Sequence, residues 1–266
     1  MLITLLTDFG AADYFVGALK GAILSVNARA RIVDITHEIP AHDVRAGAFT
    51  LLAAYGSFPQ GTIHVAVVDP GVGSTRRPLL ISTQGYFFVG PDNGLFSYVC
   101  ERETGARVYQ LTNEKFFSAH VSSTFHGRDI FAPVAAALSN NVPPEAFGEL
   151  IDDHVRLAPL APVRDACASW SASIIHIDRF GNLVTNVTPR ELAGEEFGEG
   201  VKLEIGGRVI SSFRRFYAEE TGGAAGELFA IWGSAGFLEI AADCASAAHL
   251  LHAERGQTVR VAALKS

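Results

Sequence analysis

Short apolar runs alternate with segments of helical character through the first part of this 266-residue chain. Residues 3–6, 31–36 and 62–68 are rich in β-branched and other apolar side chains, which predicts three strands. Residues 15–26 repeat apolar side chains on one helical face, and residues 44–54 form a second predicted helix. This order predicts a parallel sheet covered by helices, because parallel neighbours need a crossover connection.

The chain continues with further strands and helices and then changes character at a proline-rich stretch. Residues 79–90 predict two strands around a Gln-Gly turn, and helices are expected near 95–100 and 130–138. The segment LAPLAPVRDA opposes both a helix and a central strand, because its prolines hold an extended path. We therefore expect an α/β N-terminal domain with a mainly parallel sheet over residues 1–157, followed by a linker over residues 158–167.

Beyond the linker, short β-like runs are separated by turn signals such as Phe-Gly-Asn and Gly-Gly. These runs cover residues 173–177, 183–187, 201–205, 228–232, 237–241 and 258–262. Strands of this kind predict a smaller, mainly β domain, either a barrel or a sandwich, over residues 168–266.

The composition excludes several classes of partner. Hydrophobic residues make up 48% of the chain and charged residues only 18%, which is typical of a globular protein with a sizeable core. The formal net charge is −7 and like charges form no block longer than two, which argues against nucleic acid as a partner. The longest stretch without charged residues, 46–68, is interrupted by Gly, Pro, Gln and His, so no membrane span is expected.

The cysteines and the first residues of the chain favour a cytoplasmic location. Cys100, Cys167 and Cys244 lie far apart without a C-x-x-C spacing, so they predict neither a disulfide framework nor a thiolate metal site. The first residues carry no basic segment and reach Asp8 after a short apolar run, unlike a secretory signal. We therefore expect a cytoplasmic protein.

Polar side chains follow each of the three predicted parallel strands, at the edge where ligands bind to such sheets. Asp8 follows the first strand, His37 the second and Asp69 the third. The alternative is that each of them only caps a helix or closes a turn. Three such positions on one edge favour a binding or catalytic site.

The loop DPGVGSTRRP after the third strand contains Asp69, Arg76 and two glycines. A β-like run follows this loop, whereas a phosphate-binding loop leads directly into a helix, so phosphate binding is disfavoured. Gly71 and Gly73 are instead expected to allow close backbone approach to a ligand, with Asp69 and an arginine on opposite sides of one turn.

The turn STFHGRD places His126 just before a predicted helix. Imidazole and carboxylate groups suit divalent ions, so this histidine could belong to a metal site. The other possible ligands are His37, His64, Asp8, Asp13 and Asp69. No H-x-H or H-E-x-x-H spacing occurs, so we expect no metal, and a metal-dependent phosphoesterase is the alternative function.

Six motifs, in order along both predicted domains, resemble one enzyme family. They are TDFGAADYFVGALKG (7–21), VDPGVGSTRRP (68–78), PDNGL (91–95), STFHGRDIFAP (123–133), IDRFGNLVTN (177–186) and GSAGFLEIA (233–241). Together they resemble the SAM hydroxide adenosyltransferase family, the hydrolase relatives of fluorinase. Enzymes of this kind attack C5′ of the ribose of S-adenosyl-L-methionine (SAM), and water or hydroxide as nucleophile yields adenosine and methionine. The resemblance thus implies a SAM hydrolase with no additional cofactor.

The resemblance also implies roles for individual residues. The catalytic Asp, Arg and His of the hydrolases fall on Asp69, Arg76 and His126, and either the aspartate or the histidine can take the proton of water. Asp8 matches the residue that holds the ribose hydroxyls, and Asn182 matches an adenine or ribose contact. The residues matched to the methionine end are Asp178, Ser234 and Glu239, and Tyr217 is matched to an aromatic wall.

The resemblance further implies a homotrimer, with SAM bound between the N-terminal domain of one subunit and the C-terminal domain of its neighbour. A two-domain cleft within one chain fits the sequence equally well. Asp69 and His126 stand where fluorinase has tyrosines, and Gly127 replaces the serine that helps to bind halide, which implies water or hydroxide as nucleophile. His42 replaces a tryptophan of fluorinase. A non-catalytic SAM or adenosine sensor is the remaining alternative.

Overall fold

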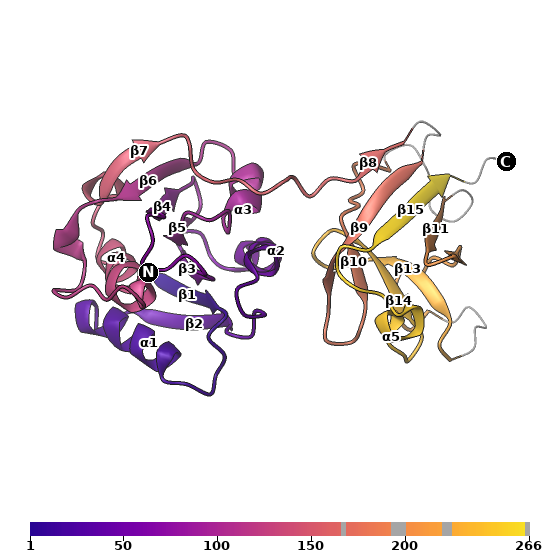
Figure 1. Cartoon of the computed structure of the whole chain (residues 1–266), viewed down its shortest axis with the longest axis horizontal. Helices are drawn as coiled ribbons and strands as arrows, with labels where there is room; N and C mark the ends of the chain where they lie inside the picture. The colour runs from indigo at the N-terminus through magenta and orange to yellow at the C-terminus, as the bar shows by residue number, and fades with distance from the viewer. Residues whose placement is uncertain (166–168, 193–200, 220–224, 264–266) are drawn as a thin grey trace. The chain divides into compact units, whose positions relative to one another are not determined.

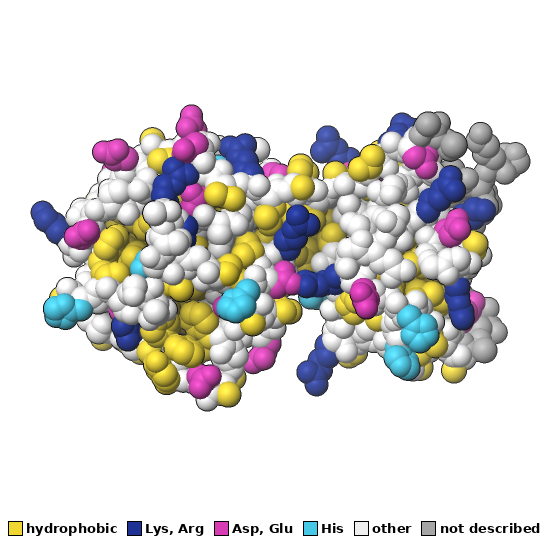
Figure 2. Space-filling model, in the orientation of Figure 1, with side chains coloured by type: hydrophobic (Ala, Val, Ile, Leu, Met, Phe, Trp, Pro, Cys, Tyr) yellow, Lys and Arg dark blue, Asp and Glu magenta, His cyan; other side chains and the backbone are white. Residues whose placement is uncertain are grey.

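The computed structural model describes residues 1–165, 169–192, 201–219 and 225–263. The chain divides into two compact units, Met1–Pro159 and Leu160–Ser266, each with its own hydrophobic core (Figure 1). Acidic and basic side chains are interspersed over the face shown in Figure 2. In the described part of the chain, no helix combines the length and the apolar character needed to cross a membrane.

The first unit contains a seven-stranded sheet with the order β2-β1-β3-β5-β4-β6-β7. Its strands are β1 (Leu2–Thr7), β2 (Arg31–Thr36), β3 (Ile63–Val67), β4 (Pro78–Ser82), β5 (Phe87–Pro91), β6 (Arg107–Leu111) and β7 (Gly148–Ile151). β1, β2, β3 and β5 run parallel, whereas β4, β6 and β7 pair in antiparallel fashion. The α/β class is confirmed, with a mixed sheet that is parallel where strands and helices alternate.

Two pairs of helices cover the two faces of this sheet (Figure 1). α1 (Phe15–Val26) packs beside α4 (Ala132–Ser139), and α2 (Val44–Ala54) packs beside α3 (Ser97–Arg102). Leu19 and Ile23 of α1 are fully buried in one cluster with β1 and α4, as the helical periodicity predicts. α2 begins after Asp43, whose side chain accepts a hydrogen bond from the Ala46 N–H at 2.8 Å and thereby caps the helix.

In the described residues of the second unit, the strands pair in antiparallel fashion. They are β8 (Val163–Arg164), β9 (Trp170–Ile177), β10 (Leu183–Thr185), β11 (Val201–Ile205), β12 (Arg208–Ile210), β13 (Leu228–Trp232), β14 (Leu238–Ala242) and β15 (Thr258–Ala263), and the short helix α5 (Ala247–Leu251) follows β14. Their order is β12-β11-β15-β9-β10-β14-β13, and β8 pairs with β9. Phe213, which follows β12, forms a bridge to Ala230 in β13, so the sheet nearly closes into a barrel. The expectation of a smaller, mainly β domain is confirmed.

Candidate active site

The carboxyl ends of β1 and β3 lie at a pocket with a volume of about 260 Å³. Asp8 follows β1 directly, and Asp69 lies two residues beyond the end of β3. The pocket is lined by Asp8, Phe9, Phe15, Ala41, His42, Val67, Asp69, Val72, Thr124, Phe125, His126 and Gly127. Asp8, Asp69 and His126, far apart in the sequence, therefore surround one cavity of the first unit.

Hydrogen bonds join Asp69, Arg76 and His126 into one group. Arg76 Nε donates to Asp69 Oδ1 at 2.9 Å, and Arg76 Nη2 donates to Asp69 Oδ2. The same Nη2 lies 2.8 Å from His126 Nδ1. The side chains of Asp69 and Arg76 are only 5% and 8% exposed. This ion pair is therefore bidentate and shielded from solvent, the geometry in which such pairs are strongest and most rigid.

Arg76 determines how His126 can act. An arginine side chain only donates hydrogen bonds, so His126 Nδ1 is the acceptor and the hydrogen of the neutral ring lies on Nε2. Burial lowers the pKa of His126, and the charge of Arg76 lowers it further, while the charges of Asp69 and Asp129 oppose this shift. His126 is therefore neutral near pH 7, with its Nε2–H group as a donor.

Arg76 also carries a nitrogen whose hydrogen-bonding capacity is not used by the protein. Among the described residues, its Nη1 atom is buried without a hydrogen-bond partner. Buried N–H groups in proteins almost always have an acceptor, so this atom marks a place for an oxygen of water or of a ligand. The guanidinium also lies over the ring of Phe131, with Cζ 5.3 Å from the ring centroid, a cation–π contact that holds it in place.

Close packing of two loops brings Arg76 to His126. Gly73 has a φ of +77°, and a Cβ atom at this position would collide with the carbonyl oxygen of Ser123. A glycine is therefore required where the loop after β3 crosses the loop before α4. The close backbone approach that Gly73 allows here is to Ser123. His126 directly precedes a π-helical turn, Gly127–Phe131, a local form that is frequent at functional sites.

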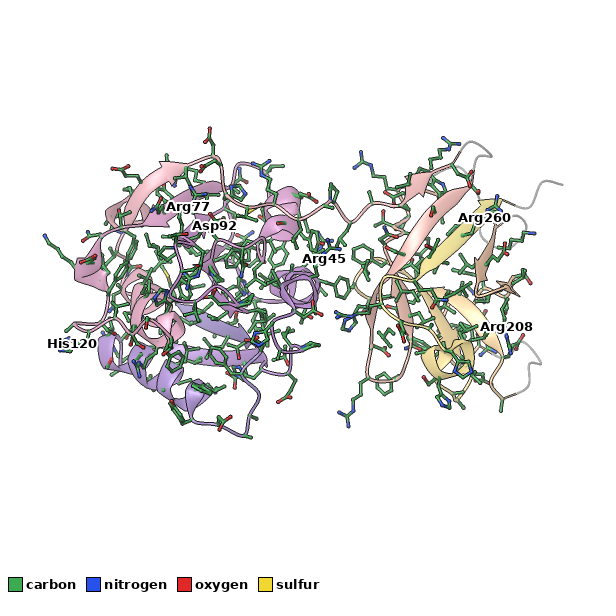
Figure 3. All side chains as sticks on the ribbon, viewed as in Figure 1. Arg45, Arg77, Asp92, His120, Arg208 and Arg260 are labelled. Atoms are coloured by element: carbon green, nitrogen blue, oxygen red, sulfur yellow. The ribbon has the colours of Figure 1, made fainter. Side chains whose placement is uncertain are left out.

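The two arginines at the end of the loop after β3 bind different carboxylates. Arg76 pairs with Asp69, whereas Arg77 lies beside Asp92 (Figure 3). Arg77 Nε donates to Asp92 Oδ2 at 2.8 Å and its Nη1 donates to Asp153 Oδ1 at 2.7 Å. Asp69 and Arg76, which stand at the two ends of this loop, are thus paired with each other, and Arg77 links the loop to the segment after β7.

Asp8 is oriented by the loop that follows β2. Its Oδ2 atom accepts a hydrogen bond from the backbone N–H of His42 at 2.8 Å. His42 has a φ of +68°, a conformation that is uncommon for residues other than glycine. His42 is also among the residues that line the pocket. One carboxylate oxygen of Asp8 is thus held by the protein, at a position beside the cavity.

In the second unit, Asp178 and Asn182 form the turn between β9 and β10. Asp178 Oδ1 accepts hydrogen bonds from the backbone N–H groups of Phe180 and Asn182, each at 2.8 Å. Asn182 Nδ2 also donates to Asp178 Oδ2 at 2.9 Å. The carboxylate thus shapes this turn, while Phe180 at its tip is 77% exposed.

Tyr217 and Glu239 form a second polar group in this unit. The Tyr217 hydroxyl donates to Glu239 Oε2 at 3.1 Å. Burial raises the pKa of Glu239 and the charge of Asp178 raises it further, whereas the hydrogen bond from Tyr217 opposes the shift. Burial and the neighbouring Glu239 charge raise the pKa of Tyr217 to about 12. Ser234 lies exposed in the turn between β13 and β14, next to Gly233, over whose backbone the Glu239 side chain packs.

Three polar residues considered from the sequence lie outside the pocket lining. His37 and His64 each bind a threonine of β1, and Asp13 is exposed. Across the described ranges, no group of three or more His, Cys, Asp or Glu side chains is placed to hold a metal ion. Sequence reasoning missed the aromatic lining by Phe9, Phe15 and Phe125, although each stands within a polar motif that was singled out.

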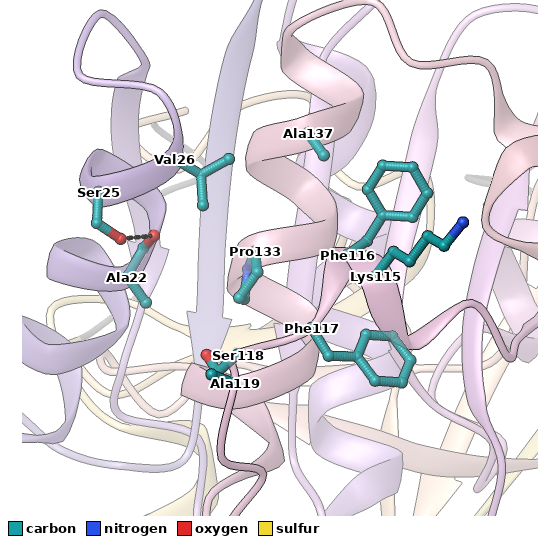
Figure 4. Close-up of a pocket in the computed structure, with 10 residues that line it drawn as sticks. All are labelled: Ala22, Ser25, Val26, Lys115, Phe116, Phe117, Ser118, Ala119, Pro133 and Ala137. Atoms are coloured by element: carbon teal, nitrogen blue, oxygen red, sulfur yellow. Dashed lines mark hydrogen bonds between the residues drawn. The ribbon is translucent and has the colours of Figure 1, made fainter.

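A second cavity of about 310 Å³ lies between α1, α4 and residues 115–119 (Figure 4). No residue that the sequence predicts for a site is among those that line it. Its lining consists mostly of small and apolar side chains, with Lys115 at one side and Ser25 donating to the Ala22 carbonyl at 2.8 Å. The first pocket, with its carboxylates, histidine and adjacent arginine, is therefore the candidate for catalysis.

Comparison with known proteins gives the same family from both halves of the chain. The profile of the SAM hydroxide adenosyltransferase N-terminal domain matches residues 3–148, and that of the C-terminal domain of the same family matches residues 172–260. A Methanocaldococcus jannaschii protein named (R)-S-adenosyl-L-methionine hydrolase is 37% identical over 264 residues, which cover 95% of this chain and 92% of that protein. A fluorinase of an Actinoplanes species is 27% identical, over 98% of this chain and 97% of its own.

A solved structure resembles the whole chain. The crystal structure of an uncharacterized conserved protein from Thermotoga maritima matches with a TM-score of 0.89 and 33% sequence identity, over 98% of this chain and 100% of that chain.

Proposed function

The chain belongs to the SAM hydroxide adenosyltransferase family, and from this we infer that it is a SAM hydrolase that forms adenosine and L-methionine. The observation that carries the proposed mechanism is the buried group of Asp69, Arg76 and His126 at the pocket that also contains Asp8. Curated relatives are named for the (R) form of SAM, so we propose the (R) epimer at sulfur as the substrate.

The proposed reaction is a direct displacement at C5′ of the ribose. The water oxygen forms a bond to C5′ while the C5′–S bond breaks, and the electron pair of that bond stays on sulfur. The sulfonium becomes the neutral thioether of methionine, and water loses one proton. Because positive charge disperses in the transition state, an uncompensated anion beside sulfur would favour the ground state. The bidentate pairing with Arg76 compensates the charge of Asp69, which suits this requirement.

We assign the proton of water to Asp69. Each oxygen of this carboxylate binds Arg76, but an ionised carboxylate has further lone pairs with which to accept a hydrogen bond from water. His126 Nδ1 is already occupied by Arg76, so His126 serves as a donor through Nε2. The unpartnered Nη1 of Arg76 favours the developing hydroxide. A positioned base of this kind typically contributes about 10²- to 10⁴-fold to the rate.

Other residues hold the parts of SAM that do not react. Asp8 accepts hydrogen bonds from the two ribose hydroxyls, because an ionised carboxylate can accept from both. Asn182 contacts the adenine or the ribose. The methionine end is held by Asp178, Ser234 and Glu239, with Tyr217 as an aromatic wall. An ammonium group beside the buried Glu239 would stabilise its charged form, against the effect of burial.

We propose a homotrimer in which SAM binds between the N-terminal domain of one subunit and the C-terminal domain of its neighbour. Within each subunit, we propose an N-terminal domain over residues 1–157 and a C-terminal domain over residues 168–266. The proposed location of the protein is the cytoplasm. Two observations support the proposed trimer. The pocket is lined by residues of the first unit alone, and its volume of about 260 Å³ is smaller than the roughly 300–1,000 Å³ usual for ligand sites, so further residues are needed to enclose SAM. Light scattering that shows a stable, fully active monomer would contradict the trimer.

The function is tested by incubating the purified, exhaustively chelated protein with SAM that contains both sulfonium epimers, followed by chromatography. Equal amounts of adenosine and methionine, formed from the (R) epimer, are expected. Bound but unchanged SAM would indicate a sensor instead of an enzyme. Inactivity that a divalent ion restores would indicate a metalloenzyme and would overturn the metal-free mechanism.

A further inference from the structure

Strand β1 carries two buried threonines that each bind a histidine of a neighbouring part of the fold. Thr4 Oγ1 lies 2.7 Å from His64 Nδ1, and Thr7 Oγ1 lies 2.8 Å from His37 Nδ1. Thr4 is 1% exposed and Thr7 is fully buried. The proposed reaction uses none of these four residues. Both pairs join a threonine hydroxyl to a histidine Nδ1, but their surroundings differ. The surroundings of Thr7 and His37 indicate a role for that pair.

The pair of Thr7 and His37 continues into two charged side chains. His37 Nε2 lies 3.2 Å from Asp34 Oδ1, and Lys20 Nζ donates to Asp34 Oδ2 at 2.6 Å. Burial acts to raise the pKa of Asp34, but the hydrogen bond from Lys20 and the nearby Lys20 and His37 charges outweigh it and the pKa is lowered. Asp34 is therefore an ionised acceptor.

The Thr7 hydroxyl lies between His37 and the backbone of Phe9. Thr7 Oγ1 is hydrogen-bonded to His37 Nδ1 at 2.8 Å, and the other ring nitrogen of His37 faces the Asp34 carboxylate. The Thr7 oxygen in turn accepts from the backbone N–H of Phe9 at 3.2 Å. One continuous series of contacts therefore runs from Lys20 on α1 to the residue that follows Asp8.

This series holds the backbone on both sides of Asp8. Thr7 precedes Asp8, Phe9 follows it, and the N–H of Gly10 donates to the carbonyl oxygen of His37 at 2.7 Å. The Asp8 carboxylate is held by the N–H of His42, which lies in the same loop as His37. The position of Asp8 relative to the pocket therefore depends on how the loop after β2 is fixed to β1, and the bond between Thr7 and His37 is the buried side-chain contact between them.

We propose that Thr7 and His37, supported by Asp34 and Lys20, are positioning residues that orient the Asp8 carboxylate toward the ribose hydroxyls. The inference rests on the role proposed for Asp8 in the SAM hydrolase. Neither Thr7 nor His37 lines the pocket, so any effect on ribose binding acts through Asp8.

The pair of Thr4 and His64 provides the matched control. The His64 ring lies among aromatic side chains, 5.1 Å from Phe88, 5.7 Å from Phe58 and 6.1 Å from Tyr55 between ring centroids. Burial lowers its pKa to about 4. These residues do not line the pocket. Replacing Thr4 or Thr7 by the isosteric valine removes the hydroxyl that pairs with a buried histidine Nδ1 in each case, so both variants should lose stability. Thr7→Val also leaves the Phe9 N–H without its side-chain acceptor.

The test compares Thr7→Val, Thr7→Ser and Thr4→Val in the full chain. The dissociation constants of adenosine and 2′,3′-dideoxyadenosine are measured by calorimetry. The ratio of the dideoxyadenosine constant to the adenosine constant reports how strongly Asp8 binds the ribose hydroxyls. Thr7→Val should reduce this ratio by roughly tenfold, the value of one charge-assisted hydrogen bond. Thr7→Ser, which keeps the hydroxyl, should restore it. Thr4→Val should leave the ratio within about twofold of the wild type, even with a lower Tm.

Two outcomes would overturn the inference: an unchanged ratio in Thr7→Val, or an equal loss in Thr4→Val. Should Thr7→Val fail to fold, Asp34→Asn serves instead, since its side chain is 38% exposed, and a smaller loss of the ratio is expected. A wild-type protein that prefers adenosine but does not hydrolyse SAM would contradict the proposed function alone. Hydrolysis without any preference for adenosine would contradict the role of Asp8 and this inference with it.

Discussion

The substitution Asp69→Asn removes the charge of the proposed base and keeps its shape. The asparagine side chain presents one oxygen and one NH₂ group, so one of the two Arg76 nitrogens that now donate to Asp69 would face another donor. The Arg76 side chain, only 8% exposed, would also lose its countercharge. Both the chemical step and the stability of the fold should therefore respond.

The structure predicts the size of each effect. Loss of the base should reduce kcat by at least about 10²-fold, the lower end of what a positioned base contributes. KM should change little, because Asp69 acts on water and holds no part of SAM. Leaving one partner of a buried ion pair without the other costs roughly 3–5 kcal/mol. Domains are typically stable by about 5–15 kcal/mol, so the variant should still fold at 25 °C.

The assay follows adenosine release by chromatography under saturating SAM, with calorimetry for binding and chemical denaturation for stability. Asp153→Asn is the matched control, because Asp153 also binds an arginine, Arg77, at 2.7 Å but its side chain is 72% exposed. An ion pair with so exposed a carboxylate is screened by solvent and contributes little, so this variant should keep wild-type kcat and nearly wild-type stability. A kcat for Asp69→Asn within about threefold of wild type would refute the assignment of the base.

Three further predictions follow from the same geometry. Asp8→Ala should raise the Kd for SAM by at least about tenfold with a much smaller change in kcat, because it removes hydrogen bonds to the ribose; calorimetry that shows unchanged binding would contradict this role. In oxygen-18 water with added fluoride and chloride, the label should appear at the 5′ oxygen of adenosine, since Gly127 offers a desolvated halide no hydroxyl donor; a 5′-halogenated nucleoside as major product would overturn it. The free energy of unfolding should be fully retained above pH 6.5 and should fall toward pH 4. The pKa of His64 is about 4 in the folded protein and near 6.5 in the unfolded chain, so between these pH values only the unfolded chain binds the proton and is stabilised by it. Denaturation curves at several pH values check this, and His64→Leu should flatten the dependence.

Local sequence signals were sufficient for the elements that position the site. The expected helices at 15–26 and 44–54 agree with α1 and α2, because the periodicity that predicts a helix also defines the face that packs on the sheet. The expected strand at 31–36 agrees with β2 in the same way. The order of these elements placed Asp8 and Asp69 on one edge, since parallel strands end on the same side.

Pairing between distant segments decided the rest of the sheet. β6 (Arg107–Leu111) and β7 (Gly148–Ile151) were not predicted, because short runs at the edge of a sheet have a weak alternating pattern; Leu150 is 60% exposed. Their strand conformation depends on hydrogen bonds to β4 and to each other. The predicted turn at Gln84-Gly85 joins the antiparallel pair β4 and β5, but the further antiparallel strands were not visible in the local sequence.

The sequence determined which chemical groups are present, and the tertiary structure decided how they pair. Family motifs identified Asp69, Arg76 and His126, but local patterns do not show which of two adjacent arginines binds the aspartate. That choice depends on the crossing of Gly73 over Ser123, which brings together loops some 50 residues apart. The direction of the hydrogen bond to His126, and hence its role as a donor, follows from this contact. It could not be derived from the sequence, because it is formed only when both loops are packed on the finished sheet.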